Sequence, residues 1–172
     1  MQTLETWELY GFDPEWKQAW LDLIRRVNAA ANAIANLAFA DGVRDEDVVL
    51  DVQERRVGAI IHYDLAQPLF LEALHMVEAA YARNPEAQPR FKPMGPILLR
   101  RPPVQLSTTG IETITVGPLR ALLRPFQVIG PAFEPAQFDL GPDECLLTYL
   151  DPQRYRPEGE IILSLPPGAP PL

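Results

Sequence analysis

The side chains best suited to catalysis in this sequence are His62, Asp64 and Cys145. A thiolate nucleophile needs a nearby imidazole as its base and a carboxylate that orients the imidazole. The cysteine, however, lies in the apolar run ECLLTYL, where a small buried thiol is common, and no nucleophile-elbow signature surrounds it. His62, in AIIHYD, has the pattern of a strand residue on the alternate face. We therefore expect no catalytic residue.

Two acidic clusters contain the residue types that bind metal ions. The run from Asp41 to Asp51 is rich in carboxylates, but it lacks the glycine and the final glutamate of an EF-hand loop. His75 has Glu72 and Glu78 three residues to either side, which would hold a metal only weakly. With one cysteine there is no cysteine-built zinc site, and the GxGxxG and Walker patterns are absent. We expect no metal and no cofactor.

The overall charge argues against a polyanionic partner. The chain of 172 residues has 15 basic and 23 acidic side chains, which gives a net charge of -8. A protein that follows nucleic acid phosphates or anionic lipid is normally basic. The doubled pairs Arg55–Arg56 and Arg100–Arg101 are not interleaved with aromatic residues, as a nucleic-acid platform would be. These arginines fit contacts with acidic groups of a protein partner better.

The strongest structural signal is one long helix over residues 14–41. Asp13 is a good N-cap, Pro14 suits the first helical position, and Gly42 can end the helix in the left-handed conformation. Apolar side chains repeat at a four-three spacing and form one stripe. The stripe consists of Trp16, Trp20, Leu23, Val27, Ala30, Ile34 and Leu37.

The opposite face of this helix loses its charges after Arg26. The next fourteen residues are uncharged and include Asn28, Asn32 and Asn36 at a spacing of four. Small alanines allow another backbone to approach closely, and asparagine amides can satisfy its polar groups. Either the chain's own proline-rich half or another subunit could cover this face. The three asparagines are therefore interface candidates.

The remaining elements complete an α+β fold. We expect a β-hairpin with strands near 48–52 and 56–63, then a second helix near 65–83 that ends at Asn84–Pro85. A β-rich half of short strands should follow, with a tight turn at Thr109–Gly110 and one helical turn over 118–124. The expected strands are 97–100, 104–108, 111–116, 126–129, 144–150 and 160–165.

The chain changes composition at residue 85. Only two of the 19 prolines precede it, and the net charge is -7 over residues 1–84 but -1 over 85–172. Proline sits at strand ends, edges and turns because it cannot donate to a ladder. We expect a single domain over 1–172, with an acidic helix-hairpin-helix region (1–84), a proline-rich β region (85–165) and an extended tail (166–172).

Both terminal segments have features of docking elements. WELYGFDPEW concentrates aromatic side chains, among them Trp7 and Tyr10, and the tail LSLPPGAPPL favours polyproline II through Pro166 and Pro167. Alternatively, the aromatics staple the first helix to the core, and the tail is a disordered end. We add Trp7, Tyr10, Arg100, Arg101, Pro166 and Pro167 to the interface candidates.

These patterns favour a non-catalytic structural or adaptor subunit of a larger assembly, such as a virion, a phage tail or a secretion machine. Its partners would be copies of itself or other subunits. The alternative is a small enzyme or ligand-binding domain that uses His62 and its polar neighbours. No stretch is apolar enough for a signal peptide or a membrane span, so we expect a cytoplasmic protein, or a virion protein if a phage encodes it. The motifs indicate no known family.

Overall fold

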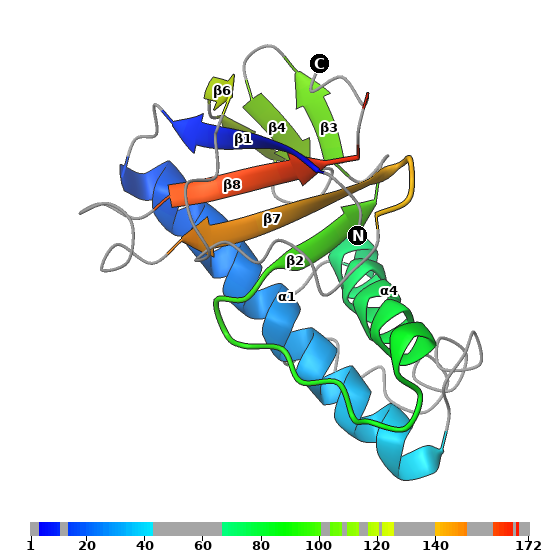
Figure 1. The fold of residues 1–172 in the computed structure, drawn as a ribbon. Helices are drawn as coiled ribbons and strands as arrows, with labels where there is room; N and C mark the ends of the chain where they lie inside the picture. Colours follow the sequence, from blue (N-terminus) through cyan, green and yellow to red (C-terminus); the bar gives the residue numbers. More distant parts are fainter. Residues whose placement is uncertain are drawn as a thin grey trace. The chain divides into compact units, whose positions relative to one another are not determined.

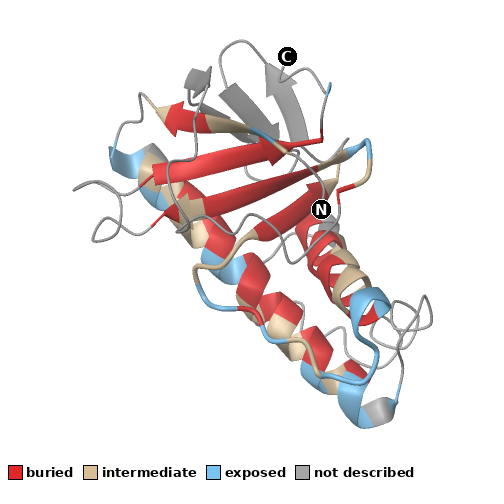
Figure 2. Ribbon diagram, in the orientation of Figure 1, coloured by how far each residue is buried: buried red, intermediate tan, exposed pale blue. Residues whose placement is uncertain are grey.

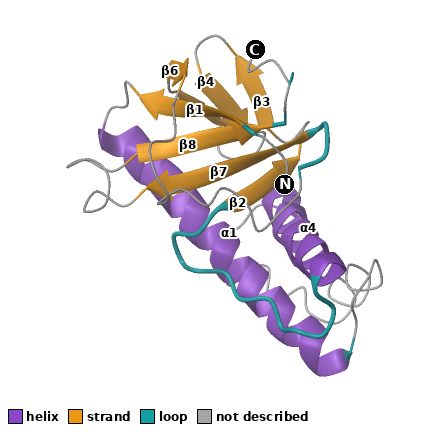
Figure 3. Ribbon diagram, viewed as in Figure 1, coloured by secondary structure: helices purple, strands orange, loops and turns teal. Residues whose placement is uncertain are grey.

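The computed structural model describes residues 4–10, 14–42, 67–100, 104–107, 110–113, 117–120, 122–125, 140–150, 160–166 and 168. These residues form two helices and antiparallel strands (Figure 1; Figure 3), which confirms the α+β class. The helices are α1 (Pro14–Asp41) and α4 (Gln67–Arg83). The strands are β1 (Glu5–Tyr10), β2 (Ile97–Arg100), β3 (Val104–Ser107), β4 (Gly110–Thr113), β5 (Gly117–Arg120), β6 (Leu122–Pro125), β7 (Glu144–Leu150) and β8 (Glu160–Leu165).

The chain divides into two compact units. One contains residues 1–22 and 96–172, and the other contains residues 23–95. The N-terminal strand β1 therefore belongs to the same unit as the C-terminal strands. The single domain over 1–172 stays a prediction.

The first unit contains a five-stranded sheet in the order β2-β7-β8-β1-β6, and every neighbouring pair is antiparallel. Buried residues extend from its inner strand β8 to its edge strand β2. All six residues of β8 are buried, and so are the three apolar residues of β2. Side chains alternate between the faces of a strand, so both faces of this sheet are covered. A second sheet has the order β3-β4-β5.

Helix α1 has the predicted bounds, and its apolar stripe is buried where the structure describes it. Trp20, Leu23, Val27, Ala30 and Ile34 are each at most 4% exposed (Figure 2). Leu37 is half-buried, and the side chain of Trp16 lies outside the described residues. At the C-terminal end, Gly42 has a φ of 72° and donates its N–H to the carbonyl of Phe39 at 3.3 Å, as expected of a C′ glycine.

Helix α4 also ends where the sequence predicts, at Arg83, and Asn84 donates a last backbone hydrogen bond to Ala80 at 3.0 Å. Leu69, Phe70, Ala73 and Leu74 are at most 3% exposed, which places the core of the second unit along this helix. Neither described helix is long and apolar enough to cross a bilayer.

The β-rich half departs from the prediction at one place. The helical turn expected over 118–124 is wrong, because β5 and β6 occupy these positions. Pro118 lies opposite Glu112 in the ladder, and β5 is an edge strand among the strands that the structure describes. Proline has no N–H to donate, and an edge strand tolerates it where the backbone faces away from the neighbouring strand. Strand pairing therefore overrides the local preference of this segment for a helical turn.

Several expected elements lie outside the described residues. These are the hairpin over 48–63 and the strand over 126–129. Gly110 is the first residue of β4 and lies opposite Ser107, so it belongs to the ladder as well as to the expected turn. Strand β1, where the sequence suggested only an aromatic cluster, was not predicted.

Candidate functional site

The three asparagines of α1 all bond to one segment of the same chain, residues 88–95, which we call the strap. Asn32 donates its Nδ2 to the carbonyl of Phe91 at 2.7 Å and accepts the N–H of Phe91 on its Oδ1 at 2.8 Å. Asn28 donates its Nδ2 to the carbonyl of Gly95 at 2.8 Å, and Gln88 donates its Nε2 to the Oδ1 of Asn36. The strap thus runs antiparallel to α1, beside which it lies in Figures 1 and 3.

The strap is extended because prolines interrupt it. Pro89 and Pro93 fix their own φ, and the residues before them are biased towards extended conformations. The segment begins just after an Asx turn, in which the N–H of Glu86 bonds to the Oδ1 of Asn84 at 3.3 Å. It ends in a turn, where the N–H of Gly95 bonds to the carbonyl of Lys92 at 2.9 Å. An extended segment has no internal ladder, so the asparagines supply its missing partners.

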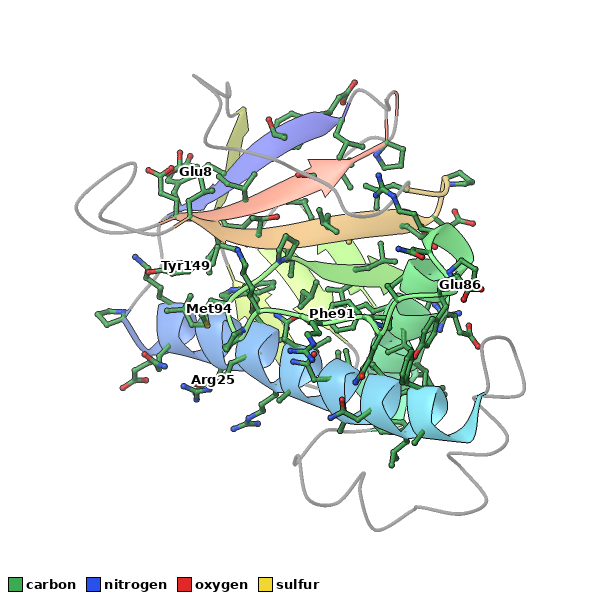
Figure 4. All side chains as sticks on the ribbon, turned by 60° about the horizontal axis from the view of Figure 1, so that its bottom comes forward. Glu8, Arg25, Glu86, Phe91, Met94 and Tyr149 are labelled. Carbon is green, nitrogen blue, oxygen red and sulfur yellow. The ribbon has the colours of Figure 1, made fainter. Side chains whose placement is uncertain are left out.

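Burial shows that the strap has an inner and an outer side. Phe91 is only 7% exposed and Met94 is half-buried, whereas Arg90 and Lys92 are exposed. Figure 4 shows Arg25, Phe91 and Met94 along this part of α1. On α1 itself, Asn28 is fully buried, Asn32 is half-buried and Asn36 is exposed. The contact between α1 and the strap is therefore more deeply buried towards the middle of the helix.

Helix α1 is covered by α4 as well within the second unit. The hydroxyl of Tyr81 donates to the carbonyl of Ala35 at 3.3 Å, and Tyr81 is 1% exposed. Ala31, Ala35 and Ala38 are also buried. The loss of charge along α1 thus has a cause within the chain itself.

The five-stranded sheet carries a second group of polar residues, which the sequence did not reveal. In the register, Ile162 lies between Thr148 on β7 and Glu8 on β1, and on its own strand it lies between Glu160 and Ser164. Side chains two apart on a strand and opposite on neighbouring strands share a face. Glu8, Thr148, Glu160 and Ser164 therefore surround Ile162 on one face, and we call them the polar ring. Tyr149 lies on the other face (Figure 4).

Every member of the polar ring is at least nine-tenths buried: Glu8 is 5% exposed, Thr148 7%, Glu160 6% and Ser164 0%. The hydroxyls of Thr148 and Ser164 form no hydrogen bond with any described residue. A buried hydroxyl without a partner costs free energy, so these two positions are polar sites that the described residues leave unsatisfied. The sequence hints at the polar ring only through β1, where Glu8 and Tyr10 alternate with Trp7 and Leu9.

The other candidates from the sequence are dispersed. Trp7 and Tyr10 are half-buried on β1, which is an inner strand, and Arg100 is half-buried at the end of the edge strand β2. Pro166 is buried after β8. Nearby, Gly168 donates its N–H to the Oε1 of Glu5 at 3.3 Å. Arg101 and Pro167 lie outside the described residues, so these candidates as a set remain predictions.

The candidates for chemistry are not brought together among the described residues. Cys145 is fully buried on β7, opposite Leu99 of β2, while His62, Asp64 and the Asp41–Asp51 run after Gly42 lie outside the described part. On α4, Glu72 is 1% exposed and His75 is half-buried. Within the ranges described above, no three His, Cys, Asp or Glu side chains are arranged to hold a metal ion.

Comparison with known proteins identifies no relative. No family model, no curated protein and no solved structure matches the chain.

Proposed function

We propose that this protein is a structural or adaptor subunit that acts through protein–protein contacts in a larger assembly. It would work in the cytoplasm, or in a virion if a phage encodes it. The observation that supports the proposal most is the strap, which is an extended segment held at a helix surface by side-chain amides at three successive turns. Fixing a segment before it meets a partner lowers the entropy cost of binding.

The asparagine residues that are interface candidates in the sequence bond to backbone and side-chain groups of the strap. Their role is to place the strap, whose outer side remains exposed at Arg90, Lys92 and Pro93. An exposed, preordered segment of this kind resembles the extended recognition elements that bind other chains.

The test is a native mass measurement beside sedimentation velocity over a wide range of protein concentration. We expect a defined oligomer, or a monomer that associates as the concentration rises. A clean monomer throughout would remove the reason to prefer an assembly subunit.

The polar ring favours a second candidate, a small-ligand-binding domain. Thr148 and Ser164 present buried hydroxyls, and Glu8 and Glu160 add carboxylates on the same face of the sheet. Such a set of oxygen atoms suits a small molecule rich in amino or hydroxyl groups. Thermal-shift screening of amines and polyols tests this candidate, and a stabilisation that is lost in Ser164→Ala would favour it over the subunit role.

A further inference from the structure

We propose that the outer side of the strap binds an extended acidic segment of a partner protein, with Arg90 and Lys92 as the contacting cations. This inference rests on the proposed function, because it names the kind of partner that the subunit would take.

Charge in the described part of the second unit is opposite to that of the whole chain. The chain has a net charge of -8, yet the exposed charged side chains described in this unit are mostly basic. Glu86 is the exposed anion among them. The exposed cations are Arg25, Arg26, Arg83, Arg90 and Lys92. Of these cations, Arg90 and Lys92 lie on the strap itself, where they attract carboxylates rather than other cations.

Arg90 and Lys92 are the cations whose backbone position is fixed by hydrogen bonds to α1. Phe91 between them is turned inward and both of its backbone groups bond to Asn32, so its neighbours alternate to the outer side. No hydrogen bond or ion pair joins either side chain to another described residue. Two cations that have no partner among the described residues therefore lie on a backbone held by Asn32.

The spacing of this pair matches an extended ligand. Residues two apart in an extended chain are separated by about 7 Å. An extended partner with Asp or Glu at every second position has the same repeat, so both cations could be paired at once. Arginine also prefers carboxylates because its guanidinium offers a planar, forked set of donors.

A protein segment fits this surface better than nucleic acid does. Phe91 is buried, so the strap offers no aromatic face on which a base could stack. The net charge of -8 opposes a long polyanion over a distance, whereas a short acidic segment meets mainly the local cations.

The test measures the binding of a short fluorescein-labelled peptide of alternating Glu and Ser by anisotropy at low ionic strength. The variant is Arg90→Glu with Lys92→Glu, and the matched control is Lys17→Glu with Arg26→Glu, which makes the same change of charge on α1 outside the strap. We expect the strap variant to lose about tenfold in affinity and the control to lose less than about threefold, since each contact is worth little in water. A peptide of alternating Gln and Ser should not bind.

Three results would overturn the inference. These are an equal loss in the strap variant and in the control, no binding of the acidic peptide at low salt, and tighter binding of a single-stranded oligonucleotide that also depends on Arg90 and Lys92.

Native mass measurement of the strap variant separates a failure of this inference from a failure of the proposed function. If the protein assembles but the acidic peptide does not bind, the subunit role stands and this partner chemistry is wrong. If the peptide binds but the protein stays a monomer, self-assembly fails and the acidic partner stands.

Discussion

Asn32 and Phe91 are 59 residues apart in the sequence and exchange two hydrogen bonds, at 2.7 and 2.8 Å. The amide of Asn32 thereby acts towards Phe91 as a neighbouring β-strand would, because it satisfies both backbone groups of one residue. Asn28 and Asn36 repeat the contact one helical turn to either side. The spacing of four in the sequence thus places all three amides on the face of α1 that meets the strap.

The first prediction concerns Asn32. Replacing it with leucine removes both bonds and leaves the backbone of Phe91 without partners in a half-buried position, so the free energy of unfolding should fall by about 2 kcal/mol. Urea melts by circular dichroism measure the change. Asn36→Ala is the control, because Asn36 is exposed and a bond at the surface should cost less than about 0.5 kcal/mol.

The same melts distinguish the two possibilities that the sequence left open, namely that the chain itself or another subunit covers the asparagine face of α1. If the strap alone covers this face, the effect of Asn32→Leu does not depend on protein concentration. A loss of stability that grows as the protein is concentrated would instead show that another subunit also covers Asn32.

The second prediction concerns Asn28, which is fully buried and donates to the carbonyls of Ile24 and Gly95 at 3.1 and 2.8 Å. Asn28→Asp keeps the shape but sets a carboxylate against two carbonyl oxygens. It should be more destabilising than Asn28→Ala by about 2 kcal/mol at neutral pH, because the added charge is buried without a donor. Equal losses in the two variants, measured by urea melts, would contradict the donor role of Asn28.

The long helices were predictable because their signals are local. Pro14 and Gly42 mark the ends of α1, and Asn84–Pro85 ends α4, each through the backbone chemistry of the residues involved. The face of Asn28, Asn32 and Asn36 was recognisable as covered, but its cover was not. A sequence does not show which distant segment reaches a helix, since that depends on the chain path between them.

Strand β1 and the polar ring were not predictable for the same reason. Residues 5–10 become a strand by pairing with β8 and β6, which lie more than a hundred residues later. The ring around Ile162 exists only once the register is set, because a shift of β1 by one residue against β8 would turn Glu8 to the face opposite Ser164.

The third prediction tests the polar ring. The hydroxyls of Thr148 and Ser164 have no partner among the described residues, so Thr148→Val and Ser164→Ala should be neutral or should raise the melting temperature. The adjacent substitution Ile162→Ala is the contrast, because it removes a fully buried side chain and should cost about 3 kcal/mol. A loss of more than about 1 kcal/mol in Ser164→Ala would show that its hydroxyl is bonded in solution.

The fourth prediction concerns Cys145, which is fully buried opposite Leu99. As a small buried thiol it should react with an aromatic disulfide reagent only when the protein unfolds, and Cys145→Ala should cost about 1 kcal/mol. Labelling is followed by absorbance in native buffer and in urea. A thiol that reacts at once in native buffer, with loss of assembly, would make Cys145 functional.

The last prediction concerns the C-terminal tail, where a buried residue precedes a weak surface contact. Pro166 is buried, whereas the N–H of Gly168 reaches the exposed Glu5 over 3.3 Å. Deleting residues 168–172 should therefore lower the free energy of unfolding by less than about 0.5 kcal/mol, and Glu5→Gln should lower it by even less. Deleting residues 166–172 should cost more, because it uncovers the end of β8.

Sedimentation of the shorter deletion tests whether the tail has a role in assembly. If the shorter deletion leaves stability unchanged but weakens the association seen by sedimentation, the tail binds a neighbour. If association is also unchanged, residues 168–172 take no part in assembly.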